Sequence, residues 1–187
     1  MTWNDQNLIK TLKENGVVVM PTDTLYGIVG RAQDAAVVNR IYAVRERNGD
    51  KPCIILIGDI NELEKFSIVL SEKQKNKLKE YWVNNSEPTS IILDCPDEKF
   101  LYLHRGTKTL AFRLPIQTGL QNLLKKIGPL IAPSANPEGF SPAENISEAK
   151  KYFGDSVDLY IDGGTLKGKA SKIVRLNKDG PVEILRI

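Results

Sequence analysis

A short polar segment directly follows the first strongly apolar run of the sequence. Pro21-Thr22-Asp23-Thr24-Leu25-Tyr26-Gly27 presents two threonine hydroxyls and one carboxylate after Val17-Val18-Val19-Met20. One interpretation is a capped turn in which Asp23 and the threonines bond their own backbone. The other is a binding loop, because ligands of α/β proteins often bind where strands end. The segment alone favours neither interpretation.

A cationic segment follows, Arg45-Glu46-Arg47-Asn48-Gly49-Asp50-Lys51-Pro52. Its two arginines offer planar forks of donors and its lysine a compact charge, a combination that suits a polyphosphate. Cations at this place would equally complement the C-terminal dipole of a preceding helix. Taken in isolation, the segment favours the helix-dipole interpretation.

A third polar segment carries small hydroxyl and amide groups. Ala132-Pro133-Ser134-Ala135-Asn136 is followed by Gly139-Phe140-Ser141-Pro142. A loop leading into a helix is the favoured interpretation, and hydrogen bonding to a nucleotide or an amino acid is the alternative. Arg113 lies within the apolar run 110–114. Its guanidinium either reaches water at a sheet edge, the commoner case, or points into an anion site.

Two other kinds of site find no support. The stretch 163–169 has the glycine and lysine spacing of a phosphate-binding P-loop, but Ala170 stands where Ser or Thr is needed. The β-like residues that follow it also argue against a P-loop, which opens a helix. Ser134, His104 and Asp94 do not predict a catalytic triad, because Ser134 lacks the G-x-S-x-G setting. We expect His104 to be an exposed residue at a strand end.

Composition limits the class of protein. Of 187 residues, 41% are hydrophobic and 26% charged, with a net charge of +3, which is typical of a globular protein able to bury its own core. No apolar run is long enough for a membrane span, and no signal-peptide pattern is present. Two cysteines and one histidine argue against a disulfide framework or a His-rich metal site. We expect one cytoplasmic domain over residues 1–187, with no protein-bound metal and no organic cofactor.

The hydrophobic pattern predicts an α/β fold in which a mixed sheet is covered by helices. Apolar residues at helical spacing, some behind caps such as Asp34 and Ser71, predict helices over 7–15, 34–44, 60–66, 72–82 and 120–127. Short apolar runs predict strands over 17–20, 53–57, 90–93, 110–114, 130–132, 159–161, 173–176 and 182–185. The turn 177–180 predicts that the last two strands form a hairpin.

Taken together and in this order, the motifs resemble those of the YrdC/TsaC family, the threonylcarbamoyl-AMP synthases, in its short single-domain form. The matching segments cover nearly the whole chain: Pro21–Gly27, Arg45–Pro52, Ser86–Ser90, Ala111–Arg113, Ser134–Asn136 and Ser171–Val174. The resemblance implies a YrdC-like twisted open mixed sheet flanked by helices, with a positively lined concave cleft. It also implies a nucleotidyltransferase that condenses L-threonine, bicarbonate and ATP, accompanied by Mg²⁺, to threonylcarbamoyl-AMP and pyrophosphate.

The resemblance further implies partners and site residues. Partner proteins would transfer the threonylcarbamoyl group to tRNA, and double-stranded RNA or tRNA is a possible ligand. L-Threonine would contact Thr24, Arg113, Ala132 and Ser171. ATP would contact Arg45, Arg47, Lys51, Thr109, Ser134, Asn136, Ser141 and Arg186, with the two arginines of the cationic segment facing phosphates. No general base is assigned, although Asp23 is a candidate.

Several residues depart from the family pattern. Arg45 stands where a lysine is usual, Glu138 replaces a small residue, and Lys172 replaces a threonine; Ser86, Glu87 and Ser90 also weaken one motif. Two alternatives therefore stay open. One is a paralogue of the same fold that acts on another nucleotide. The other is a non-catalytic module that binds double-stranded RNA or tRNA, which the mild positive charge permits.

Overall fold

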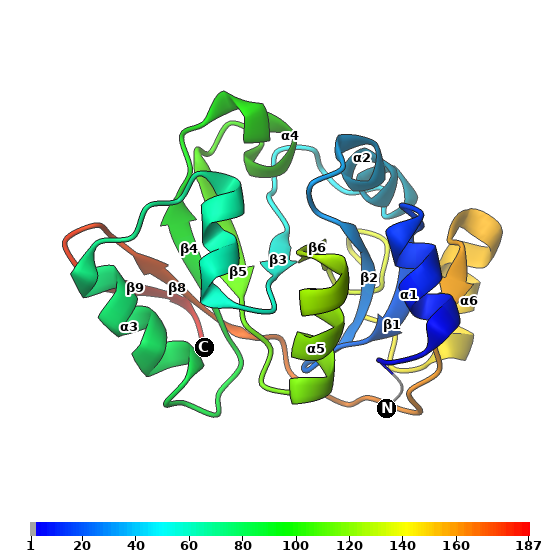
Figure 1. Ribbon diagram of the computed structural model, residues 1–187. Helices are drawn as coiled ribbons and strands as arrows, with labels where there is room; N and C mark the ends of the chain where they lie inside the picture. The colour runs from blue at the N-terminus through cyan, green and yellow to red at the C-terminus, as the bar shows by residue number, and fades with distance from the viewer. Residues whose placement is uncertain (1–2) are drawn as a thin grey trace.

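One twisted mixed sheet organises the protein in the computed structural model, which describes residues 3–187. Residues 1–2 of the expected domain lie outside this range. The strand order is β7-β1-β2-β6-β3-β5-β4-β8-β9 (Figure 1). The strands are β1 (Val18–Pro21), β2 (Tyr26–Arg31), β3 (Ile54–Leu56), β4 (Thr89–Asp94), β5 (Thr109–Arg113), β6 (Leu130–Ile131), β7 (Leu159–Tyr160), β8 (Lys172–Leu176) and β9 (Val182–Arg186).

The pairing is mixed, as the sequence predicts. The pairs β1–β7, β3–β5 and β4–β8 are parallel, whereas the remaining neighbours are antiparallel, including the predicted β8–β9 hairpin. Because β5 and β8 run in opposite directions, the end of β5 and the beginning of β8 lie at the same edge of the sheet. The site described below uses the end of β5 and the beginning of β8.

Helices cover the two faces of the sheet. They are α1 (Gln6–Lys13), α2 (Ala35–Val44), α3 (Glu72–Trp82), α4 (Leu101–His104), α5 (Thr118–Ile127) and α6 (Ile146–Phe153), with 3₁₀ turns over Ile60–Phe66, Glu98–Phe100 and Gly154–Ser156. One core, under α1 and α5, contains Leu12, Val18 and Leu124. The other core, on the opposite face, contains Ile28, Ile41 and Phe112. No helix within residues 3–187 is long and apolar enough to cross a membrane.

The predicted caps explain where two helices begin. The Asp34 carboxylate accepts hydrogen bonds from the N–H groups of Ala36 and Val37. Ser71 and Gln74 form a reciprocal capping box at the start of α3. These side chains satisfy donors that the first helical turn leaves without partners. The region predicted as a helix over 60–66 is instead a 3₁₀ helix.

Strand β2 was not predicted: its first two residues, Tyr26 and Gly27, were assigned to the polar loop, and residues 28–31 were assigned to no element. Gly30 has to be small: a Cβ there would lie 2.4 Å from Cγ1 of Val37 on α2. The glycine therefore lets α2 pack closely on the strand. The predictions also missed α4. They expected a helix after the loop that ends near Pro142, without giving its range, and α6 is that helix. They ended the first strand before Pro21, which the structure includes in β1.

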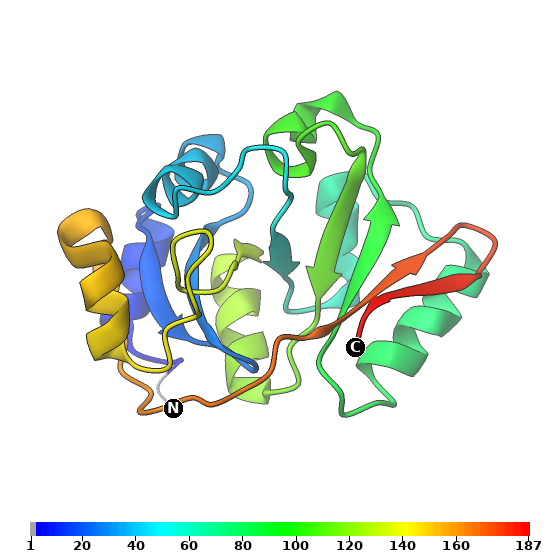
Figure 2. The same ribbon diagram turned by 180° about the vertical axis from the view of Figure 1, so that it is seen from behind.

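The helical cover is incomplete at one end of the sheet. In Figure 2, β4, β5, β8 and β9 face the viewer with no helix drawn in front of them. Ile92 and Ala111 are direct neighbours in the β4–β5 pair, and both side chains are only half-buried. This open face, together with the loop after β6, borders the site.

Candidate functional site

A cavity of about 270 Å³ gathers residues from distant parts of the chain. All four residues predicted to bind threonine line it: Thr24, Arg113, Ala132 and Ser171. Two of the residues predicted to bind ATP, Ser134 and Arg186, line it as well. The sequence motifs therefore converge on one place, which is what a binding site requires.

The sheet topology brings these segments together. Thr24 lies in the turn between β1 and β2, and Arg113 ends β5. The loop after β6 joins the start of β2, because Ile28 N–H donates to the Pro133 carbonyl at 3.0 Å and Ala135 N–H donates to the Tyr26 carbonyl at 2.8 Å. Backbone hydrogen bonds thus hold the loop that carries Ser134 against the threonine-rich turn.

The threonine-rich turn is both a capped turn and part of the cavity wall. Thr22 Oγ1 donates to the Leu25 carbonyl at 2.7 Å and accepts from the Thr24 N–H at 3.2 Å. Thr22 therefore fixes the backbone, as the turn interpretation predicts. The neighbouring Thr24 hydroxyl receives a hydrogen bond from Arg113 Nη2 at 3.2 Å and lines the cavity.

A buried ion pair lies beneath this turn. Arg113 Nη2 donates to Asp23 Oδ1 at 2.8 Å, and the two side chains are 4% and 0% exposed. The commoner interpretation of Arg113, with its guanidinium in water at a sheet edge, is therefore wrong. Within residues 3–187, Asp23 Oδ2 and Arg113 Nε are buried without hydrogen-bond partners. Such groups are costly unless a ligand or solvent satisfies them.

A second guanidinium borders the cavity from β9. Arg186 donates through Nε and Nη2 to the Ser171 carbonyl, at 3.0 and 2.6 Å. Burial and, secondarily, the charge of Arg113 lower the pKa of Arg186. Arg186 forms no ion pair with a carboxylate within residues 3–187, so its charge is available to an anionic ligand in the cavity. Ser90, which sequence reasoning did not assign to the site, shares a 2.8 Å hydrogen bond with the Ser171 hydroxyl.

Arg45 braces the loop that carries Ser134. Its side chain is buried, and Nε donates to the Asn136 carbonyl at 2.9 Å. Nη2 lies 3.4 Å from Asn136 Oδ1, which also accepts from Ser134 Oγ at 2.6 Å. Burial lowers the pKa of Arg45. The structure thus places this guanidinium under the loop, whereas the family resemblance implies a contact with phosphates. Its contact with ATP stays a prediction.

The other predicted ATP residues lie beyond the cavity wall. Arg47 Nε and Nη2 donate to the carbonyls of Lys51 and Pro52, at 3.1 and 3.2 Å, so the cationic segment is folded onto itself. Asn136 is buried behind the loop, and its Nδ2 donates to the Phe140 carbonyl at 2.9 Å. Ser141 is exposed, next to Pro142, which lines the cavity.

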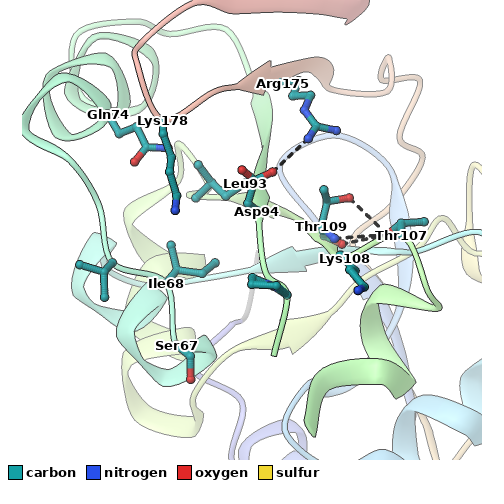
Figure 3. Close-up of a pocket in the computed structure, with 12 residues that line it drawn as sticks. Ser67, Ile68, Gln74, Leu93, Asp94, Thr107, Lys108, Thr109, Arg175 and Lys178 are labelled. Atoms are coloured by element: carbon teal, nitrogen blue, oxygen red, sulfur yellow. Dashed lines mark hydrogen bonds and ion pairs between the residues drawn. The ribbon is translucent and has the colours of Figure 1, made fainter. Parts of the chain in front are cut away.

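Thr109 is not brought to this cavity. It begins β5, whereas Arg113 ends the strand, so the two residues are separated by about 13 Å along it. Thr109 lines a separate pocket of about 500 Å³, where its hydroxyl bonds that of Thr107 at 3.2 Å (Figure 3). Asp94 and Arg175 form a 3.0 Å ion pair in the same pocket.

Sequence reasoning also missed the segment that crosses the threonine-rich turn. Tyr26 Oη accepts from the Gly163 N–H at 2.8 Å and donates to the Gly164 carbonyl at 2.7 Å. A Cβ on Gly168 would lie only 1.8 Å from the Thr24 carbonyl oxygen. The glycines that mimic a P-loop therefore permit close backbone approach. Strand β8 follows them rather than a helix, which confirms that this stretch is not a P-loop.

His104 takes no part in a triad. Its Nδ1 accepts the Gly106 N–H at 3.1 Å, and the side chain is fully buried at the end of α4. The prediction of an exposed strand-end residue is therefore wrong, because the sequence pattern did not reveal α4. Within residues 3–187, no group of three or more His, Cys, Asp or Glu side chains is placed to hold a metal ion.

The fold and the cavity define an α/β protein with a small cavity lined by two arginines, Arg113 and Arg186. The Sua5/YciO/YrdC family model, described as "Telomere recombination", matches residues 10–187. The chain belongs to this family, which confirms the resemblance inferred from the motifs.

Curated relatives and solved structures agree with that assignment. The chain is 32% identical to the threonylcarbamoyl-AMP synthase of Bacillus subtilis, over 97% of this chain and 54% of the relative. It is 26% identical to a putative threonylcarbamoyl-AMP synthase of Mycobacterium tuberculosis, over 96% and 85%. It thus spans about half the length of the Bacillus relative and most of the mycobacterial one.

Two solved structures have the same fold. Sua5 of P. abyssi complexed with L-threonine aligns with a TM-score of 0.80 and 25% identity, covering 100% of this chain and 54% of that one. YciO of E. coli aligns with a TM-score of 0.79 and 24% identity, covering 96% and 86%. These similarities confirm the predicted twisted mixed sheet flanked by helices.

Proposed function

We propose that this chain condenses L-threonine, bicarbonate and ATP to threonylcarbamoyl-AMP and pyrophosphate, which makes it a nucleotidyltransferase. The observation that carries the proposal is the cavity in which Thr24, Arg113, Ala132 and Ser171 meet. Family membership supports it, as do the relatives named threonylcarbamoyl-AMP synthase and the Sua5 structure complexed with L-threonine.

In this proposal the cavity holds the amino acid. Arg113 pairs with the threonine carboxylate, because its guanidinium lines the cavity beside the Thr24 hydroxyl. Asp23 holds the guanidinium in place from the other side. A volume of about 270 Å³ suits a small amino acid better than a whole nucleotide.

ATP would then enter from the outer side of the same cavity. Ser134 and Arg186 line the cavity, and Arg47, Lys51, Asn136 and Ser141 belong to the two segments beyond it. These cations and hydroxyls would form the positively lined cleft. Mg²⁺ would arrive as part of the nucleotide complex and use phosphate oxygens as ligands. Thr109 would contact the nucleotide only if the latter extends along β5.

The chemistry needs no side-chain nucleophile. The threonine amine and bicarbonate form a carbamate and water, and a carbamate oxygen then attacks the α-phosphorus of ATP as pyrophosphate leaves. The chain contributes by holding the two reactants in line and by placing cations beside the developing charge. Arg186 is the cation best placed for this, because it borders the threonine cavity.

The adenylate would be passed to proteins that modify tRNA. Binding of double-stranded RNA or tRNA by this chain stays a prediction, as does a cytoplasmic location. The same holds for the single-domain organisation over residues 1–187 and for the absence of a protein-bound metal.

Mass spectrometry of a rapidly quenched mixture tests the proposal. Purified protein with ATP, Mg²⁺, bicarbonate and L-threonine should give threonylcarbamoyl-AMP, and omission of threonine or bicarbonate should abolish the product. Protein that binds ATP but forms no adenylate would contradict the proposal and favour the same-fold paralogue. Salt-sensitive RNA binding without ATP binding would favour the RNA-binding module.

A further inference from the structure

Glu138, one of the departures from the family pattern, binds the cationic segment at three points. Its backbone N–H donates to the Arg45 carbonyl at 2.8 Å. Its side-chain Oε1 accepts from Lys51 Nζ at 2.6 Å, and Oε2 accepts from the Asn48 N–H. Glu138 therefore links the loop after β6 to the segment between α2 and β3, both of which are visible from the open side in Figure 2.

These contacts are the ones a phosphate oxygen would make. An ammonium group together with a backbone N–H is a common donor set for anionic oxygens. The Lys51 and Glu138 side chains are 59% and 29% exposed, so a ligand can reach them from solvent. The hydrogen bond from Lys51, followed by that from the Asn48 N–H, lowers the pKa of Glu138. The carboxylate is therefore charged at neutral pH.

We propose that the Glu138 carboxylate is an internal competitor for polyphosphate, occupying the Lys51 ammonium and the Asn48 N–H until a polyphosphate displaces it. The inference rests on the proposed function for placing ATP at this segment. Glu138 acts on affinity and not on the reacting atoms. A ligand must supply several anionic oxygens to replace it, so the competition favours triphosphates over monophosphates.

The expected effect is moderate. Exposed ion pairs are weak, but loss of the carboxylate also removes a negative charge beside an anionic ligand. We expect Glu138→Gln to bind ATP and inorganic tripolyphosphate about three- to tenfold more tightly at low salt. The gain should shrink as salt is added, because the groups are exposed. Glutamine keeps an oxygen that accepts the Asn48 N–H.

Isothermal titration calorimetry tests the inference with ATP and with tripolyphosphate. Glu80→Gln is the matched control, because Glu80 forms an exposed 2.7 Å ion pair with Lys77 on α3, on the other side of the sheet. It removes the same charge and should leave both affinities unchanged. In a Lys51→Ala background, Glu138→Gln should gain less than in the wild type. Glu138→Ala checks that the effect does not depend on glutamine.

Each outcome separates this inference from the proposed function. Tighter binding by both Glu138 variants, with Glu80→Gln unchanged, supports the competitor even if no threonylcarbamoyl-AMP is formed. Unchanged or weaker binding by the Glu138 variants overturns it while leaving synthesis of the adenylate intact. An equal gain in affinity in Glu80→Gln would show that the effect depends only on net charge, and it would overturn the inference as well. If no variant binds ATP or tripolyphosphate, both proposals fail.

Discussion

The Asp23–Arg113 ion pair should be the most sensitive electrostatic feature of the protein. The two side chains are 0% and 4% exposed, and their charged atoms lie 2.8 Å apart. Asp23→Asn would keep a hydrogen-bond acceptor but leave the buried guanidinium without its counter-charge. Breaking a buried pair from one side costs about 3–5 kcal/mol, and we expect the lower end because asparagine can still accept. That is a large share of a typical stability of about 5–15 kcal/mol.

Urea unfolding followed by tryptophan fluorescence measures this loss. The double variant Asp23→Asn/Arg113→Met removes both charges and should be about 2 kcal/mol more stable than Asp23→Asn alone, because no unpaired buried charge remains. Asp94→Asn is the control: its ion pair with Arg175 has a similar length of 3.0 Å but is exposed, so its loss should cost less than about 1 kcal/mol. A loss of stability from Asp23→Asn no greater than that from Asp94→Asn, or a double variant no more stable than Asp23→Asn alone, would refute the reasoning.

Two further predictions concern the surroundings of the site, and a third concerns the ion pair of Arg40 with Asp158 at the other end of β1. Gly168→Val should abolish threonine binding, measured by calorimetry, because a Cβ there would lie 1.8 Å from the Thr24 carbonyl oxygen; unchanged affinity would contradict this close approach. Tyr26→Phe removes two hydrogen bonds of 2.7 and 2.8 Å and should lower the free energy of unfolding in urea by about 1–3 kcal/mol. An unchanged stability would contradict the role given to these two bonds. The hydrogen bond from Arg40, more than the one from the Val17 N–H, lowers the pKa of Asp158 from its ordinary value of 3.8. Its contribution is therefore present above pH 4 and is lost as the pH falls through the lower folded value, and Asp158→Asn should flatten the stability profile there.

Local rules predicted most of the fold. The caps Asp34 and Ser71 marked helix starts that the structure confirms. Strand β2 was missed because glycine is unfavourable in strands unless another backbone or side chain approaches closely. At Gly30 the approaching side chain comes from α2, and this contact could not be read from the local sequence.

The site residues that belong to a sequence motif could be predicted. Those that reach the site only through packing could not. The four residues that the family resemblance assigned to threonine all line the cavity, as do Ser134 and Arg186. The motifs did not reveal that the Arg45 side chain would be buried and bonded to the Asn136 carbonyl. A guanidinium can donate to a phosphate or to a carbonyl equally well. Ser90 and Gly168 belong to the site through long-range contacts, with Ser171 and with the Thr24 backbone. Only the sheet order brings those segments together.

Incorporation of ¹³C-bicarbonate into threonylcarbamoyl-AMP tests the central claim most directly. The wild-type protein, given ATP, Mg²⁺, L-threonine and the labelled bicarbonate, should yield an adenylate heavier by the labelled carbon. Arg113→Lys keeps the positive charge beside Asp23 but loses the planar pair of N–H donors of the guanidinium. It should reduce the labelled product at least tenfold, because a bidentate contact with the threonine carboxylate is lost. Unlabelled or threonine-independent adenylate from the wild type, or full labelling by Arg113→Lys, would contradict the account.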